Sequence, residues 1–214
     1  MAKKTDNHNL KGKLDLRRYF LAKYHADKPP AVLDCCQGGG LLWKALREEF
    51  PVASYWGIDL KAKPGRLKID SARILSQPGW TQDVIDADVY GSPWKHWQAV
   101  LANGIAPLTV FLTRGSHSLE VLDAYEKAAI GLRFSLPIPG AFWPKLTMID
   151  LALTYALTTC SLKDKIITEI VEAVSDGNAR YVGIRLEAAT TSSPQLLPAS
   201  RSKPKRTTKE SAHV

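Results

Sequence analysis

The chain has 214 residues, 45% of them hydrophobic, and 29 Lys and Arg against 21 Asp and Glu give a formal net charge of +8. No apolar run reaches the ~18 residues of a membrane-spanning helix, and residues 1–10 lack the apolar segment of a secretory signal. The three cysteines, two of them adjacent at Cys35 and Cys36, cannot build a disulfide framework and favour a reducing, cytoplasmic setting. These features exclude a membrane protein, a secreted disulfide scaffold and a disordered chain.

The excess positive charge lies at the two ends of the chain. Residues 1–30 hold 8 Lys and Arg and 3 acids, residues 201–214 hold 5 and 1, and residues 31–200 hold 16 and 17. We therefore predict a basic N-terminal helical segment at 1–30, a folded domain at 31–188 and a disordered basic tail at 189–214. Such ends commonly contact the phosphates of nucleic acid, although many only keep a protein in solution.

Strands and helices are predicted to alternate along the chain. An amphipathic helix at 14–25 comes first and ends before Pro29. Strand-like runs follow at 31–35, 54–59, 67–70, 83–88 and 107–113, and helical runs at 41–50, 71–77, 92–103, 117–131 and 144–160. Two further strand-like runs, 166–175 and 179–188, flank a turn at 176–178. This order predicts an α/β protein with a mostly parallel sheet, helices on both faces and an antiparallel hairpin at one edge.

Acidic residues follow the first four predicted strands. These residues are Asp34, Asp59, Asp70 and Asp88. Any one of them could simply cap a helix, but ligands of open α/β sheets bind beyond the carboxyl ends of the strands. Four acids in register, with the glycine turn 38–40 after the first strand, therefore predict a ligand site there.

The glycine turn matches only some nucleotide-binding patterns. A dinucleotide site needs G-x-G-x-x-G, but Trp43 occupies the third glycine position and is predicted to pack in the core. The phosphate loop G-x-x-x-x-G-K-[ST] is absent. The pattern that fits is D-x-x-x-G-x-G, formed by Asp34, Gly38 and Gly40.

The fourth predicted strand ends in the sequence Asp88-Val89-Tyr90-Gly91-Ser92-Pro93. The Asp88 carboxylate and the Val89 carbonyl could accept hydrogen bonds from an exocyclic amino group and orient its nitrogen for reaction. Tyr90 could stack on a base. The chemistry of these residues is compatible with an amino-nitrogen target.

These motifs resemble those of the class I S-adenosylmethionine (SAM) dependent methyltransferases. Asp-Val-Tyr-Gly-Ser-Pro is similar to the D-P-[FY]-G-S-P of the tRNA (guanine-N2) dimethyltransferase family, with Val89 in place of the first proline. The resemblance covers roughly residues 31–188 and implies a Rossmann-like sheet of seven strands that ends in an antiparallel hairpin. Members of that tRNA-modifying family are larger and carry a further C-terminal domain.

The resemblance also implies roles for single residues. The turn at Gly38 and Gly40 would approach the methionine part of SAM, Asp59 would accept hydrogen bonds from the ribose hydroxyls, and Asp70 would contact the adenine edge. The cofactor-binding residues would be Asp34, Gln37, Gly38, Gly40, Asp59, Asp70 and Ser71, and the catalytic residues Asp88, Val89, Tyr90 and Gly91. The expected cofactor is SAM, and no metal is expected.

The expected function is methyl transfer to an exocyclic amino nitrogen of a base in RNA or DNA. Two alternatives stay open: a methyltransferase acting on a protein or small molecule, and an inactive SAM-fold protein that binds nucleic acid. Four further groups of side chains had two interpretations each. The first group is Trp94, Lys95 and Trp97, which could contact nucleic acid, or one Trp could lie in the core with the others in solvent. The second is Arg17 and Arg18, which could bind phosphates or face solvent, and the third is His117, which could touch substrate or only begin a helix. The fourth is Cys35 and Cys36, which are expected to pack rather than bind metal.

Overall fold

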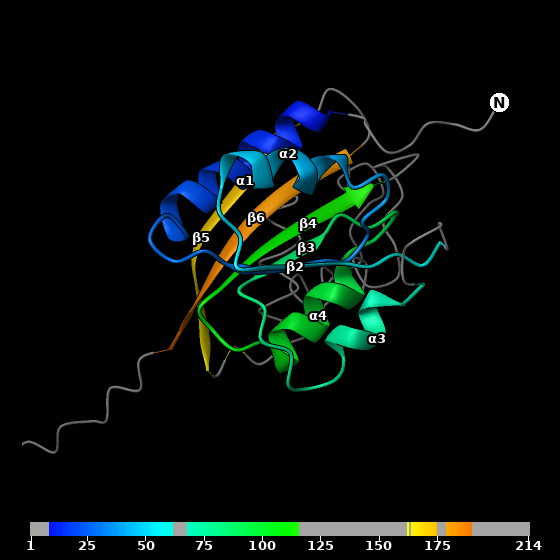
Figure 1. The fold of residues 1–214 in the computed structure, drawn as a ribbon. Coiled ribbons are helices and arrows are strands. Elements are labelled where there is room, and N and C mark those ends of the chain that lie inside the picture. Colours follow the sequence, from blue (N-terminus) through cyan, green and yellow to red (C-terminus); the bar gives the residue numbers. More distant parts are fainter. Residues whose placement is uncertain (1–8, 62–67, 116–161, 163, 175–178, 190–214) are drawn as a thin grey trace, which may run out of the picture.

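The protein forms one mixed β-sheet with helices on both faces (Figure 1). The structure is a computed structural model that describes residues 9–61, 68–115, 162, 164–174 and 179–189. The described strands are β1 (Ala31–Asp34), β2 (Ser54–Gly57), β3 (Val84–Ala87), β4 (Leu108–Gly115), β5 (Lys165–Val174) and β6 (Ala179–Ala188). The described helices are α1 (Leu10–Tyr24), α2 (Leu41–Glu49), α3 (Ser71–Leu75) and α4 (Trp94–Asn103).

The strands lie in the order β2-β1-β3-β4-β6-β5. The first four pair in parallel, whereas β6 runs antiparallel to both β4 and β5. After β1 the chain adds β2 on one side and β3 on the other, so the order reverses between β1 and β3. In open α/β sheets this switch point is where the crevice for a ligand forms.

Two apolar layers cover the sheet, and the period-2 alternation of the strands divides side chains between them. Val32 and Val84 point toward the layer with α1 and α2, and Leu33 and Ile85 point toward the layer with α3 and α4. Figure 1 shows these two pairs of helices on opposite faces of the sheet. The central strands are therefore buried on both faces, which is typical of parallel strands with continuous apolar sequences.

Helix α1 packs directly on the sheet. Phe20 is fully buried and lies edge-on to the ring of Phe111, with 5.6 Å between the ring centroids. On the neighbouring strand β6, a Cβ atom at Gly183 would overlap the Phe20 ring. The close approach of helix and sheet at this point therefore requires glycine.

The strand predicted at 67–70 is not formed by its described residues. Lys68 makes a single bridge to Asp59, and Asp70 already caps α3 by accepting a hydrogen bond from the Ala72 N–H. Seven strands were predicted, and the described residues form six. The predicted helices at 117–131 and 144–160, the turn at 176–178 and the tail from 190 lie outside the described residues. Among those that are described, no helix is both long and apolar enough to cross a membrane.

Candidate functional site

Three loops meet at the carboxyl ends of β1, β2 and β3, which we call the carboxyl edge. The glycine turn after β1 needs a left-handed backbone at Gly38 and Gly40, whose φ angles are 51° and 73°. The N–H of Gly38 donates to Oδ2 of Asp59, which follows β2, at 3.0 Å. The glycine turn and Asp59, 21 residues apart, are thus brought together as predicted.

Asp59 is buried, and both of its carboxylate oxygens contact backbone. Besides the bond from Gly38, Oδ1 accepts the N–H of Lys61 at 2.8 Å. A carboxylate oxygen has two acceptor positions, so each oxygen keeps one for a further donor. Asp59 can therefore hold the glycine turn and still accept a hydroxyl.

Asp34 lies beneath the glycine turn. It accepts hydrogen bonds from the Tyr55 hydroxyl at 2.7 Å and the Cys36 N–H at 3.3 Å. Burial, reinforced by the nearby Asp86 carboxylate, raises the pKa of Asp34 to about 7. The residue thus supports the turn from inside the fold.

Gln37 also helps to hold the glycine turn against β2. Its backbone N–H donates to the Ile58 carbonyl at 2.9 Å. A Cβ atom at Gly57 would come within 2.6 Å of the Gln37 side chain and 2.7 Å of the Tyr55 hydroxyl. Glycine at 57 therefore leaves room for the side chain of Gln37 against β2.

Asp88, at the end of β3, is held by a lysine of α1. Lys13 Nζ donates to both carboxylate oxygens, at 2.8 and 2.6 Å, and the two side chains are only 12% and 18% exposed. Burial acts to raise the pKa of Asp88, but the charges of Lys13 and Arg17 outweigh it and lower the pKa below its ordinary value. Asp88 is therefore an ionised hydrogen-bond acceptor.

Asp86, two residues earlier, forms a second and fully buried ion pair with α1. Arg17 donates to it through Nε at 2.7 Å and Nη2 at 2.6 Å, and Trp43 Nε1 donates at 2.7 Å. Residues four apart on a helix are separated by about 6 Å along its axis. Residues two apart on a strand are separated by about 6.6 Å. Lys13 and Arg17 therefore match Asp88 and Asp86 as a ladder of two ion pairs.

Lys13, Asp86, the pairing of Arg17 with Asp86 and this hydrogen bond of Trp43 were not predicted from the sequence. The signal was present, because K-x-x-x-R on a helix and D-x-D on a strand each place two charges on one face. The proposal that Arg17 binds phosphate or faces solvent is wrong, since it is buried against Asp86. Arg18 is also engaged, with Glu49 and Asp15.

Exposed apolar side chains follow each of the three site strands. Leu41 is 48% exposed, Leu60 60% and Tyr90 70%. Binding sites for small molecules combine such apolar surface with a few polar groups. Val89 is half-buried against the α3–α4 layer, and Gly91 turns the loop with φ 94°.

The glycine turn and the 88–93 loop are neighbours in space. Burial raises the pKa of the Cys36 thiol to about 12, and a hydrogen bond from the backbone of Tyr90 acts against this rise. Cys36 is thus a packed residue between the two loops. Within the described part of the chain, no group of three or more His, Cys, Asp or Glu side chains is arranged to hold a metal ion.

Ser71 and Asp70 are oriented differently. Ser71 is buried and its hydroxyl lies 2.8 Å from Nε2 of His96, whose pKa is lowered to about 4 chiefly by burial. Asp70 is half-buried at the start of α3. Asp70 therefore stands at the rim of the site, whereas the Ser71 side chain packs between α3 and α4.

The expectation that only one of the two α4 tryptophans lies in the core is wrong. Trp94 and Trp97 are both 0% exposed, so neither can stack on nucleic acid. Their i, i+3 spacing places them on one face of the helix, and this face packs on the sheet. Lys95 between them is exposed, and His117 lies outside the described residues.

Comparison with known proteins finds likeness in structure alone. No family model matches the chain, and no curated protein sequence matches it. Trm1 from Pyrococcus horikoshii, solved with SAM, matches with a TM-score of 0.56 at 14% identity over 85% of this chain and 56% of that one. The plantazolicin methyltransferase BamL, in complex with a triazolic desmethylPZN analog and SAH, matches with a TM-score of 0.47, 13% identity and coverage of 82% and 84%.

A third match is magnesium protoporphyrin IX methyltransferase from Synechocystis PCC 6803 with bound SAH, with a TM-score of 0.46, 13% identity and coverage of 82% and 84%. The order of the strands and the match to the Trm1 structure show a Rossmann-like α/β fold. The chain spans 56% of the length of the Trm1 structure.

Proposed function

We propose that this protein is a SAM-dependent methyltransferase that modifies an exocyclic amino nitrogen of a base in RNA or DNA. One arrangement carries the proposal. An ionised Asp88, a neighbouring carbonyl and the exposed ring of Tyr90 lie beside a glycine turn at the switch point of the sheet. These are the groups needed to hold an amino group and its aromatic base next to a nucleoside cofactor.

The residues of the carboxyl edge fit SAM in their chemistry. Asp59 keeps acceptor positions for the two ribose hydroxyls, and Asp70 offers a carboxylate to the adenine amino group. The exposed side chain of Leu60, next to Asp59, supplies apolar surface for the adenine ring. The left-handed turn at Gly38 and Gly40 has no side chains there that would keep the amino-acid end of the cofactor away from the backbone.

SAM, when bound, supplies an electrophilic methyl group on a positively charged sulfur. The chain's own residues position the acceptor. Asp88 and the Val89 carbonyl accept hydrogen bonds from the amino group, which directs the nitrogen lone pair away from them and toward the methyl carbon. Tyr90 holds the base by stacking, a contact worth about 1–3 kcal/mol in comparable sites.

Lys13 determines what Asp88 can do. Because the ammonium group keeps Asp88 ionised, the carboxylate remains an acceptor at any working pH but is a weak base. Methyl transfer from bound SAM would leave a positive charge on the acceptor nitrogen, and the proton of that nitrogen would then leave to water. Asp88 therefore acts by positioning the nitrogen rather than by removing the proton.

Incubation with radiolabelled SAM and pools of RNA, DNA and protein tests the proposal. We expect label in nucleic acid, and a fall of at least ~100-fold in kcat for Asp88→Ala because positioning is lost. Asp27→Ala, which removes an exposed carboxylate before β1, is the matched control. SAM affinity measured by calorimetry should stay unchanged in both variants. Label in protein only, or full activity of Asp88→Ala, contradicts the proposal.

Lys13→Met separates positioning from structural support. Without the ammonium, the pKa of Asp88 rises above its wild-type value because burial is opposed mainly by Arg17 alone, so the variant should lose activity at low pH and regain it as the pH rises. The wild type should lack this acid limb. A loss of equal size at every pH would mean that Lys13 only stabilises the fold.

A further inference from the structure

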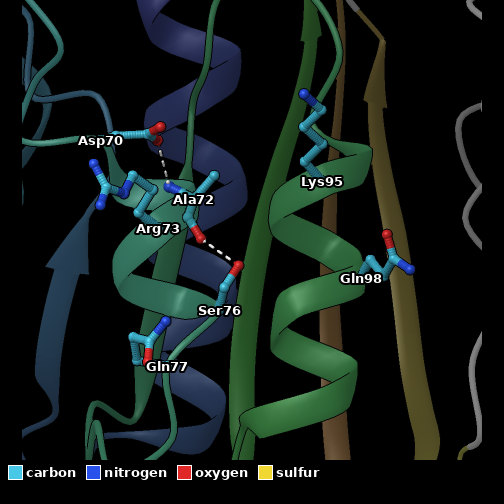
Figure 2. Close-up of a pocket in the computed structure, with 7 residues that line it drawn as sticks. All are labelled: Asp70, Ala72, Arg73, Ser76, Gln77, Lys95 and Gln98. Atoms are coloured by element: carbon cyan, nitrogen blue, oxygen red, sulfur yellow. Dashed lines mark hydrogen bonds between the residues drawn. The ribbon is translucent and has the colours of Figure 1, made fainter.

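A polar pocket opens between α3 and α4, beside the carboxyl edge (Figure 2). It has a volume of about 410 Å³ and is lined by Asp70, Ala72, Arg73, Ser76, Gln77, Lys95 and Gln98. In Figure 2 the Lys95 side chain extends from the start of α4, at the end of the pocket where Asp70 lies, whereas the Arg73 side chain extends from α3 to the side away from α4. The two cations therefore stand on different sides of the pocket wall, and Lys95 is at the end near the proposed cofactor site.

The two cations of the pocket have no anionic partner in the part of the chain that the structure describes. Arg73 and Lys95 are both exposed and form no ion pair there. The Asp70 carboxylate accepts the Ala72 N–H at 3.0 Å as the cap of α3. A guanidinium and an ammonium without acidic partners, on two neighbouring helices, can each contact a different phosphate of an extended polyanion.

The opposite layer shows a different use of positive charge. On α1 every described lysine and arginine forms an ion pair, the acidic partners being Asp15, Glu49, Asp86, Asp88 and Glu169. These cations are already balanced by the fold. Although residues 1–30 carry much of the net charge, the described part of this segment is not the natural place for a polyanion.

Two further cations precede α3 in the chain. Lys61 and Lys68 are exposed and form no ion pair among the described residues. They add positive charge between β2 and α3, the helix that carries Arg73.

We propose that the α3–α4 pocket, through Arg73 and Lys95, binds the phosphate backbone of a single-stranded nucleic acid. The choice of a nucleic acid as the anion rests on the proposed function. A strand that lies across the pocket passes the carboxyl edge, where an unpaired base can reach the exposed ring of Tyr90. The amide side chain of Gln77 offers a further hydrogen-bonding group along the same path.

Binding of a fluorescently labelled single-stranded RNA to the full chain, measured by anisotropy at several salt concentrations, tests this surface. Each phosphate contact in a single strand contributes about 0.7 to the slope of log K against log[salt]. The double variant Arg73→Gln/Lys95→Gln should therefore lower the magnitude of the slope by about 1.4. Lys11→Gln/Lys44→Gln removes two exposed charges from the α1–α2 face and is the matched control.

The proposal that the pocket binds phosphates is refuted if the Arg73→Gln/Lys95→Gln variant keeps the wild-type slope, or if the control variant changes the slope equally. Methyl transfer and SAM binding are measured on the same proteins. A lowered slope in a protein that transfers no methyl group supports the pocket and contradicts the proposed function. Methylation of RNA with an unchanged slope supports the proposed function and overturns the pocket.

Discussion

Replacing Asp86 by Asn keeps the size of the side chain but removes the charge that balances Arg17. The two side chains are 0% and 1% exposed and share two hydrogen bonds of 2.7 and 2.6 Å. Loss of one partner of a buried ion pair typically costs about 3–5 kcal/mol, because the other charge stays buried without compensation. For a chain of this size, that corresponds to a fall in Tm of roughly 6–20 °C.

A double-mutant cycle isolates the pair. Arg17→Met should also destabilise the protein, since Asp86 then lies buried beside Asp34 and Asp88 without its cation. In Arg17→Met/Asp86→Asn neither charge remains, and the main residual loss is the weakened hydrogen bond from Trp43, about 1–3 kcal/mol. The two single losses should therefore exceed the double loss by at least about 3 kcal/mol.

Urea unfolding followed by circular dichroism measures all four proteins. Single variants that each lose less than about 1 kcal/mol, or losses that simply add in the double variant, would refute the reasoning. Such a result would mean that water reaches the pair and that α1 is not fixed over β3 by charge. Retention of the coupling in the absence of SAM would show that the pair belongs to the fold itself.

Two other substitutions test the packing of α1 and the region around it. Gly183→Ala places a methyl group against Phe20 and should cost about 1–3 kcal/mol in thermal unfolding; Phe20→Leu in the same chain should recover part of the loss, and a neutral Gly183→Ala would contradict the close contact. Burial, and next the charge of Arg185, lower the pKa of His25 from 6.5 to about 4. The unfolded chain then binds more protons between these pH values, so this residue's contribution to stability is lost as the pH falls from 6.5 to 4. His25→Gln should flatten the pH dependence of the unfolding free energy in that window by up to about 1.4 kcal/mol per pH unit, and an unchanged pH dependence would show that His25 charges freely in the fold.

The sequence pattern alone was sufficient to predict the strands, turn and helices around the candidate site. The glycine turn stands between an apolar run and an amphipathic run, so strand, turn and helix follow from local periodicity. The strand at 179–188 was predicted with the bounds that the structure shows. The loop from Asp88 to Pro93 is continuous in the chain, and its place after a strand needs no tertiary information.

The predicted strand at 67–70 shows where local pattern is insufficient. Its alternation is strand-like, but Asp70 follows at once and caps α3. The backbone therefore leaves the extended conformation after a single bridge at Lys68. Competition between a short strand and a helix cap is decided by the neighbours available for pairing, which a sequence does not list.

The strand-end acids, the glycine turn and the loop at Asp88 were determined by sequence, because each depends on residues near one another in the chain. What only the tertiary structure decided is the partner of each charge. Lys13 and Asp88 are 75 residues apart, and many lysines and acids of this chain could have formed such a pair. Docking of α1 over β3 selects this one, since the Phe20 ring fits only where Gly183 leaves room for it. The positive charges of Lys13 and Arg17, which the sequence left free to contact a polyanion, are therefore paired with acids at the site.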